Sequence, residues 1–231
     1  MKASGKRDEK IQTIMFLRHG VAKHNLPDPV TGASPNLRSP TLWDPPLVTQ
    51  GMKQALSVRE RLADGPLQSV DLIIASPLTR CLQTAHLVFF PPGTSSYDKD
   101  PIPLTCMEQV REAYGMHYPD KRRDKSLLEK HWPFVHFDPS MTDRDEQWSE
   151  TRRETIDDVV QRVTQFLDWV AKREETNICV VSHGVWIEAC FQAYFPMMLE
   201  NGRRVYNCDF FQGQLVSQNG KFVRLQNLGR I

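Results

Sequence analysis

Near its N-terminus the chain reads Ile14-Met15-Phe16-Leu17-Arg18-His19-Gly20, four consecutive apolar residues followed by an arginine, a histidine and a glycine. Two later segments have the same form: residues 72–75, followed by Ser76-Pro77, and residues 178–181, followed by Ser182-His183-Gly184. Continuous rather than alternating apolarity is typical of strands buried on both faces of a sheet. We therefore expect three buried strands, each ending in a polar turn.

A helical pattern follows each of these runs. Apolar residues recur at helical spacing over three segments, residues 49–63, 78–89 and 185–195. A further helix is expected over residues 151–172, with Thr151 and Glu154 as its capping box. Strands that alternate with helices predict an α/β fold, which we expect to be a single three-layer α/β/α domain (residues 1–231) around a mostly parallel central sheet.

Three segments fall outside this alternation. The C-terminal part, residues 205–225, is predicted to form a hairpin with a turn at Asn219-Gly220, or else edge strands. Residues 115–148 are charged and irregular but carry several aromatic side chains. Loops of this length in a compact domain are usually functional lids or disordered, and the aromatic content favours an ordered lid insertion. Residues 1–10 are expected to form a flexible N-terminus.

Composition limits the partners of the chain. Its 231 residues include 29 Lys+Arg and 28 Asp+Glu, a net charge of +1, so no overall basic field favours nucleic acid or an anionic membrane. The first ten residues lack the apolar core of a signal peptide. Five cysteines without metal-ligand spacing indicate reduced thiols and no metal site, and we expect a cytoplasmic protein. Its oligomeric state is not predicted.

The polar residues that follow the expected strands are the candidates for a functional site. In open parallel sheets, ligands bind beyond the carboxyl ends of the strands, and Ser76 is placed to cap a helix that carries Arg80 in its first turn. Two arginines and two histidines around one point repel each other unless an anion lies between them. A phosphoryl group meets that need, because its oxygens accept from Arg18, Arg80 and His183 while His19 attacks phosphorus.

Taken together, these blocks resemble the histidine phosphatase superfamily, the phosphoglycerate mutase-like proteins. The resemblance covers about residues 14–195, and residues 108–126 further resemble a plant and fungal branch of phosphoglycerate mutase-like proteins. It rests on Arg18-His19-Gly20, Asn25, Pro46-Leu47, Thr49, Gly51, Gln54, Ala55, Ser76-Pro77, Arg80, Thr84, Ala85 and Ser182-His183-Gly184.

The resemblance implies a role for each matched residue. His19 would be the nucleophile that becomes phosphohistidine, and Arg18, Arg80 and His183 would form the phosphate pocket. Asn25 would donate a hydrogen bond to the phosphate, or else cap its own turn. No metal or cofactor is implied.

The general acid and the substrate contacts of the lid are less closely specified. Glu108 directly follows an expected weak strand, where the family places its acid, and Glu112 is the alternative; we favour Glu108 because it lies closer to the strand end. Arg122 and Arg123, together with Lys121, would bind a second anionic group of the substrate, or else belong to a solvated charged loop.

The expected function is a metal-independent phosphatase that hydrolyses small phosphate monoesters through phosphohistidine, with a small phosphorylated metabolite as its partner. One alternative is phosphoglycerate mutase-type transfer, in which the phosphoryl group returns to a second hydroxyl. Another is a non-catalytic scaffold that binds phospho-ligands. Such a scaffold would be expected to lack His19, Arg80 or His183, and all three are present.

The nucleophile hypothesis predicts that His19→Ala abolishes turnover and leaves the fold intact, because no other group can take over the covalent step. An acid-labile phosphoenzyme should be trapped from radiolabelled substrate with the wild type and be missing in the variant. Circular dichroism serves as the folding control. Wild-type rates in His19→Ala would refute the assignment.

Overall fold

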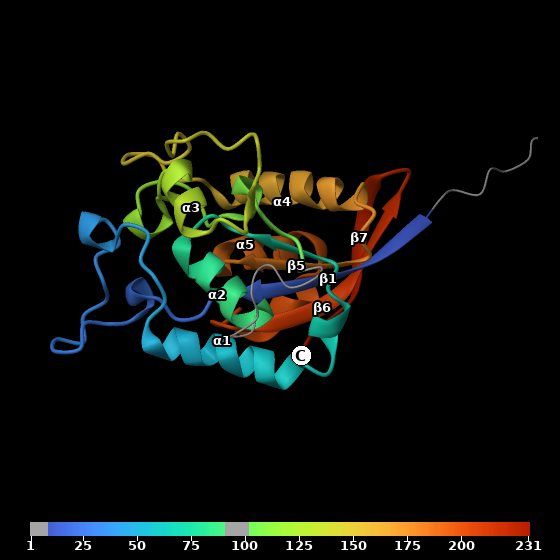
Figure 1. Ribbon diagram of the computed structural model, residues 1–231, viewed down its shortest axis with the longest axis horizontal. Coiled ribbons are helices and arrows are strands. Elements are labelled where there is room, and N and C mark those ends of the chain that lie inside the picture. The colour runs from blue at the N-terminus through green and yellow to red at the C-terminus, as the bar shows by residue number, and fades with distance from the viewer. Residues whose placement is uncertain (1–8, 91–101) are drawn as a thin grey trace, which may run out of the picture.

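The central sheet of the computed structural model, which describes residues 9–90 and 102–231, has seven strands in the order β4-β3-β2-β5-β1-β6-β7 (Figure 1). Their bounds are β1 (Glu9–Arg18), β2 (Leu72–Ala75), β3 (Leu104–Cys106), β4 (His136–Phe137), β5 (Asn177–Ser182), β6 (Phe210–Gln218) and β7 (Lys221–Arg230). Neighbours from β4 to β1 pair in parallel, whereas β1 with β6 and β6 with β7 pair antiparallel. The mostly parallel sheet expected from the sequence is confirmed.

Four helices cover the two faces of this sheet (Figure 1). They are α1 (Thr49–Leu62) and α2 (Thr79–Phe89) on one face, and α4 (Ile156–Ala171) and α5 (Gly184–Tyr194) on the other. Successive side chains of a strand point to opposite faces. In β1, Met15 and Leu17 therefore pack with α1 and α2, and Ile14 and Phe16 pack with α4 and α5. All four side chains are fully buried, which accounts for the continuous apolar run.

Helix α4 begins later than its sequence pattern predicts. The capping box of Thr151 and Glu154 does not form, so that prediction was wrong. Thr155 caps the helix instead: its side-chain oxygen accepts from the backbone N–H of Asp158, whose carboxylate accepts from the N–H of Thr155. Glu154 is held outside the helix by an ion pair of 2.8 Å with Arg162. Both Thr151 to Glu154 and Thr155 to Asp158 have the sequence of a capping box. Glu154 is paired with Arg162, and the second pair forms the cap.

The segment 115–148 contains more regular structure than an irregular lid. It includes α3 (Lys125–His131) and the edge strand β4, which pairs with β3. Trp132 and Phe134 pack against the hydrophobic cluster on the α1 and α2 face of the sheet. Residues 125–137 of this segment therefore pack against the core of the fold.

Strands β1, β6 and β7 confirm the predicted hairpin and show that the expected flexible N-terminus was wrong for residues 9 and 10. Strands β6 and β7 form the predicted hairpin, and Asn219 and Gly220 at its turn have φ angles of 51° and 71°, the left-handed region that an Asn-Gly turn favours. Glu9 and Lys10 belong to β1 and pair with β6. The rest of the N-terminus expected to be flexible, residues 1–8, lies outside the described residues.

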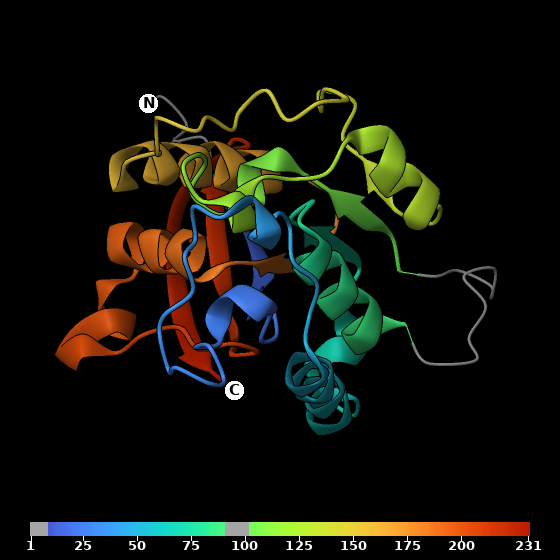
Figure 2. The same ribbon diagram turned by 90° about the vertical axis from the view of Figure 1, so that its left-hand side faces the viewer.

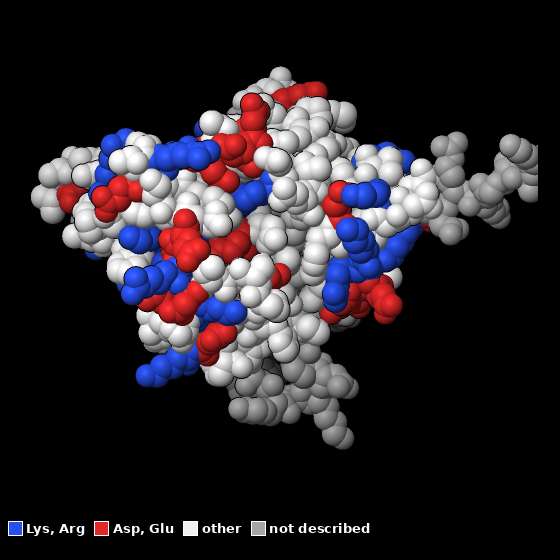
Figure 3. All heavy atoms as spheres, turned by 90° about the horizontal axis from the view of Figure 1, so that it is seen from above, with Lys and Arg blue, Asp and Glu red and all other residues white. Residues whose placement is uncertain are grey.

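The surface carries charges of both signs. On the face shown in Figure 3, basic and acidic side chains are interspersed, as the net charge of +1 suggests. Within the described part of the chain, no helix is both long enough and apolar enough to cross a membrane.

Helix α1 approaches the loop after β1 closely enough to require a glycine. The backbone N–H of Val21 donates to Oε1 of Gln54 at 3.0 Å. A Cβ atom on Gly51 would lie 2.1 Å from the carbonyl oxygen of Val21 and 2.7 Å from its nitrogen. Because real Cβ atoms do not approach backbone atoms so closely, only glycine at position 51 allows α1 to hold this loop.

We predict that Gly51→Ala destabilises the chain by at least about 1–3 kcal/mol, the range for overpacking a well-packed region, and displaces the loop that follows His19. Urea denaturation measures the change. Gly229→Ala is the control, since among the described residues, apart from its two chain neighbours, no atom lies within 4 Å of its Cβ position. Equal stabilities of the two variants would contradict the close approach.

Candidate active site

The carboxyl ends of β1, β2 and β5 bring the predicted histidines and Arg80 together. The rings of His19 and His183 are 5.1 Å apart between centroids. Arg80, in the first turn of α2, donates from Nε to Nε2 of His19 at 3.2 Å and from Nη2 to Nδ1 of His183 at 3.1 Å. All three are at most 1% exposed. Figure 2 shows the loop after β1 (blue) and the segment after β3 (green) lying across this edge of the sheet.

The hydrogen bonds of His19 assign its tautomer. Its Nδ1 lies 2.7 Å from the carbonyl oxygen of Gly20 and donates to it, which leaves Nε2 as the acceptor for Arg80. The N–H of Gly20 in turn donates to Oγ1 of Thr84 at 3.1 Å. Burial, and then the charges of Arg80 and Arg18, hold the pKa of His19 well below its usual value. A neutral ring with an unprotonated Nε2 is the form that attacks phosphorus.

His183 has a defined orientation as well. Its Nε2 donates to Oγ of Ser76 at 2.7 Å, while Nδ1 accepts from Arg80, and burial followed by the charge of Arg80 lowers its pKa well below the usual value. Ser76 is therefore not the N-cap of α2, contrary to prediction. The helix begins at Thr79, whose N–H and hydroxyl donate to the carboxylate of Asp44 at 2.9 and 2.6 Å. A residue distant in sequence supplies the cap.

Arg18 carries an unsatisfied donor at the same edge. Its Nη1 donates to the carbonyl of Val205 at 2.6 Å, but its Nε is buried without a hydrogen-bond partner among the described residues. A Cβ on Gly184 would lie 3.2 Å from Cζ of Arg18, so the glycine leaves room for the guanidinium beside the start of α5. A buried donor without an acceptor is unfavourable, and an anion bound here would satisfy it.

Asn25 adopts the second of the two roles considered for it. Its Oδ1 accepts from the backbone N–H of Ala22 at 3.0 Å, and its own N–H donates to the carbonyl of the same residue. The side-chain oxygen therefore closes a local turn, and a hydrogen bond from the side-chain amide group to phosphate stays a prediction.

His24 is a residue of this site that the sequence analysis did not select. Its ring centroid lies 5.9 Å from that of His19, and its Nδ1 is buried without a hydrogen-bond partner in the described residues. Burial, followed by the charges of Arg80 and Arg18, lowers its pKa to about 2. No sequence pattern predicts that a single histidine in this loop lies beside His19, because the path of the loop after β1 is set by tertiary contacts.

The two candidate acids lie in different surroundings. The carboxylate of Glu108 is paired with Arg111 at 2.6 Å and with Arg122 at 2.5 Å, so both of its oxygens are engaged. Glu112 is held at the start of α5, where the N–H of Val185 donates to its Oε2 at 3.3 Å. These contacts favour Glu112 over Glu108 as the acid of the site. Glu108 was preferred because it lies closer to the strand end in sequence, and the sequence did not predict its ion pairs with two arginines.

The surroundings of Glu112 also suit a group that must hold a proton. Burial, and next the nearby carboxylate of Asp120, raise its pKa above the usual value, and the charge of Arg80 acts in the opposite direction. A raised carboxyl pKa is the condition for general acid catalysis near neutral pH.

Arg122, one residue of the predicted substrate clamp, is engaged by the protein itself, while a substrate contact of Arg123 or Lys121 stays a prediction. Arg122 is 1% exposed and donates to Glu108 and to four backbone carbonyls, those of Arg123, Thr142, Asp143 and Arg144. The prediction that Arg122 clamps the substrate is therefore corrected: its donors are occupied by the protein itself.

The neighbours of Arg122 are also held by the protein. The guanidinium of Arg123 lies over the ring of Trp43 at 4.2 Å from its centroid, and its Nη2 donates to the carbonyl of the same residue at 2.8 Å. The ammonium of Lys121 lies 4.3 Å from the ring centroid of Trp148. These contacts fix the segment to its surroundings, and they place neither cation beside the histidines.

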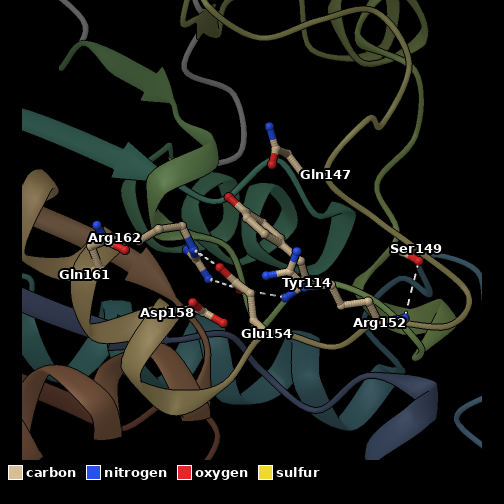
Figure 4. Close-up of a pocket in the computed structure, with 8 residues that line it drawn as sticks. All are labelled: Tyr114, Gln147, Ser149, Arg152, Glu154, Asp158, Gln161 and Arg162. Atoms are coloured by element: carbon tan, nitrogen blue, oxygen red, sulfur yellow. Dashed lines mark hydrogen bonds and ion pairs between the residues drawn. The ribbon is translucent and has the colours of Figure 1, made fainter.

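A surface hollow of about 280 Å³ lies beside the segment that carries Glu112 (Figure 4). Its lining residues are Tyr114, Gln147, Ser149, Arg152, Glu154, Asp158, Gln161 and Arg162. Arg162 pairs with Glu154 and donates to the carbonyls of Gln109, Arg111 and Glu112. The charged groups of this hollow therefore support the backbone around Glu112, and the hollow does not include the histidines.

Comparison with known proteins shows the family of this chain. The sequence model of the histidine phosphatase superfamily (branch 1) matches residues 14–227. Phosphoglycerate mutase-like protein 1 of Arabidopsis thaliana is 30% identical over 195 residues, 75% of this chain and 68% of that protein. A second Arabidopsis phosphoglycerate mutase-like protein is 26% identical over 206 residues, 80% of this chain and 75% of that protein. The chain therefore belongs to the histidine phosphatase superfamily.

Solved structures share the same fold. The mycobacterial glucosyl-3-phosphoglycerate phosphatase aligns with a TM-score of 0.58 and 17% identity, over 95% of this chain and 97% of that chain. The alpha-ribazole phosphatase from Shigella flexneri aligns with a TM-score of 0.56 and 20% identity, over 92% and 94%. At these identities the likeness is one of fold.

The lowered pKa of His24, a partly buried residue, predicts a measurable pH dependence. Histidine in the unfolded chain titrates near pH 6.5, whereas the pKa of His24 in the folded chain is lowered to about 2. The unfolded state takes up the proton first, so stability is lost as the pH falls through about 6.5. Between about pH 7.5 and 5.5 the wild type should lose about 1.4 kcal/mol more free energy of unfolding than His24→Asn.

Urea denaturation of both proteins at the two pH values measures this difference. Comparison with His24→Asn cancels the contributions of all other titrating groups. Equal losses would show that the folded chain also protonates His24.

Proposed function

We propose that this chain is a phosphatase that hydrolyses small phosphate monoesters through a phosphohistidine at His19. The observation that carries the proposal is the tautomer of His19: Nδ1 is tied to the carbonyl of Gly20, and the unprotonated Nε2 faces the guanidinium of Arg80. Arg18 adds a buried Nε without a partner in the described residues. A nucleophilic nitrogen beside guanidiniums suits an incoming phosphoryl group.

In the first step, Nε2 of His19 attacks phosphorus in line with the ester oxygen. The P–N bond forms as the P–O bond to the leaving group breaks, and the proton of the Glu112 carboxyl group passes to the leaving oxygen. The arginines stabilise the charge on the equatorial oxygens. The pKa of Glu112, raised by burial and by Asp120, favours the protonated form that this step needs.

In the second step, the carboxylate of Glu112 takes a proton from water. The water oxygen attacks phosphorus, the P–N bond breaks, and inorganic phosphate leaves. Nε2 of His19 regains its lone pair and Glu112 its proton, so the site returns to its initial state. The two arginines already supply positive charge around the phosphoryl group, and we expect the cycle to need no metal ion.

The partner we propose is a small phosphorylated metabolite, since both catalytic rings are at most 1% exposed. Phosphoglycerate mutase-type transfer is the second candidate, and the names of the Arabidopsis relatives favour it. A mutase must hold the second hydroxyl of its acceptor in place of water. Arg122, which the sequence suggested for that clamp, is bound to Glu108 and backbone carbonyls instead, and this supports hydrolysis.

The acid assignment predicts a leaving-group-dependent defect in Glu112→Gln. For an alkyl phosphate, whose leaving alkoxide needs a proton, loss of the acid should lower the rate of phosphoenzyme formation about 100- to 10,000-fold. For 4-nitrophenyl phosphate this step should be much less affected. Rapid-quench measurement of both substrates separates the first step from the hydrolysis of phosphohistidine.

Glu108→Gln is the matched control, since it makes the same chemical change four residues away. It removes the charge that pairs with Arg111 and Arg122, so it should lower the free energy of unfolding. The rate of the folded variant, relative to the wild type, should be the same for both substrates. The reverse pattern, with the dependence in Glu108→Gln alone, would contradict the assignment of Glu112.

A further inference from the structure

Each of the three nitrogens of the Arg80 guanidinium already donates a hydrogen bond within the protein. Besides the two histidines, Nη1 donates to the carbonyl oxygen of Pro119 at 2.5 Å and Nη2 to Oδ1 of Asp120 at 3.1 Å. Asp120 is 5% exposed. A carboxylate and a carbonyl oxygen therefore occupy the positions that two oxygens of a phosphoryl group would take on this arginine.

A phosphoryl dianion and the carboxylate of Asp120 compete for the same guanidinium. If both stayed on Arg80, two like charges would meet in a buried site, where their repulsion is only weakly screened. One of them must leave this position.

Asp120 has a second cation to hold it. Its Oδ2 is 3.1 Å from Nη1 of Arg153 and 3.8 Å from Nδ1 of His117. Nη1 of Arg153 is fixed in turn by the carbonyls of Ala113 and Gly115, at 3.2 and 2.9 Å. The carboxylate can therefore give up Arg80 and remain paired with Arg153, which avoids leaving a buried charge without a partner.

The backbone around Asp120 is anchored from outside the site. The N–H of Tyr118 donates to the carbonyl of Leu37 at 2.8 Å, and the indole N–H of Trp148 donates to the carbonyl of His117 at 2.9 Å. On the other side of Asp120, Lys121 lies over the rings of Trp43 and Trp148. Because these contacts hold both flanks, an exchange at Arg80 requires only a local movement of residues 119–120.

We propose that Asp120 is a specificity-determining residue that competes with the substrate for Arg80 and transfers to Arg153 when a dianionic phosphoryl group binds. This rests on the proposed function, because it takes Arg80 as the phosphate ligand. A monoanionic group, such as a sulfate ester, gains less from Arg80 and does not displace the carboxylate. Asp120 thereby selects for dianions.

Direct binding of inorganic phosphate, measured by isothermal titration calorimetry, tests the exchange without relying on turnover. Asp120→Asn removes the competing charge and keeps the shape, so it should bind phosphate about tenfold more tightly, the size of one charge-assisted pair. Arg153→Gln removes the second holder and should weaken phosphate binding. The double variant should behave as Asp120→Asn does, since the exchange no longer exists.

Glu150→Gln is the matched control, because Glu150 accepts from the Tyr118 hydroxyl at 2.8 Å and carries the same charge without touching Arg80. It should bind phosphate as the wild type does. Unchanged or weaker binding in folded Asp120→Asn overturns the proposal. If that variant does not fold, Arg153→Gln decides, and unchanged binding there overturns it. Failure to trap a phosphoenzyme from the wild type would instead refute the proposed function.

Discussion

The site depends on one buried guanidinium. Arg80 is 1% exposed, and a guanidinium out of water requires an acceptor for each of its donors. The structure gives each of its three nitrogens at least one acceptor, through His19, His183 and residues 119–120. The charge of Arg80 also helps to lower the pKa of both histidines, so the ring nitrogens that face it stay unprotonated. The two histidines, Arg80 and the covering segment are thus parts of one electrostatic arrangement.

The sheet order explains how distant residues reach this arginine. Strands β2, β5 and β1 are neighbours in the sheet and run parallel, so their carboxyl ends lie side by side. The covering segment is held by a second set of buried charges, in which Arg111 pairs with Glu108 and Asp145, and Arg122 pairs with Glu108. Such buried pairs are costly to break, which makes them suited to fixing the segment that brings Glu112 and Asp120 to the site.

Errors of the sequence-based reading share one cause. Ser76 was expected to cap α2, but its hydroxyl accepts from His183, and Asp44 caps the helix. Glu108 was preferred as the acid and Arg122 was expected to bind substrate, but they bind each other. In each case a residue of the expected type stands at the expected place in the chain, and a partner far away in sequence decides what its polar atoms do.

What the sequence determined by itself was set by local physics. Unbroken apolar runs of four residues that end in turn residues are typical of strands covered on both faces, and in a parallel sheet the polar residues that end neighbouring strands lie at one edge. That sufficed for the fold and for the grouping of His19, His183 and Arg80. Only the tertiary structure paired Glu108 with two arginines and placed Glu112 at the start of α5, brought His24 to His19, and placed Asp120 on Arg80. Burial and ion pairing depend on how loops return to the sheet, and no local pattern in the chain encodes that return.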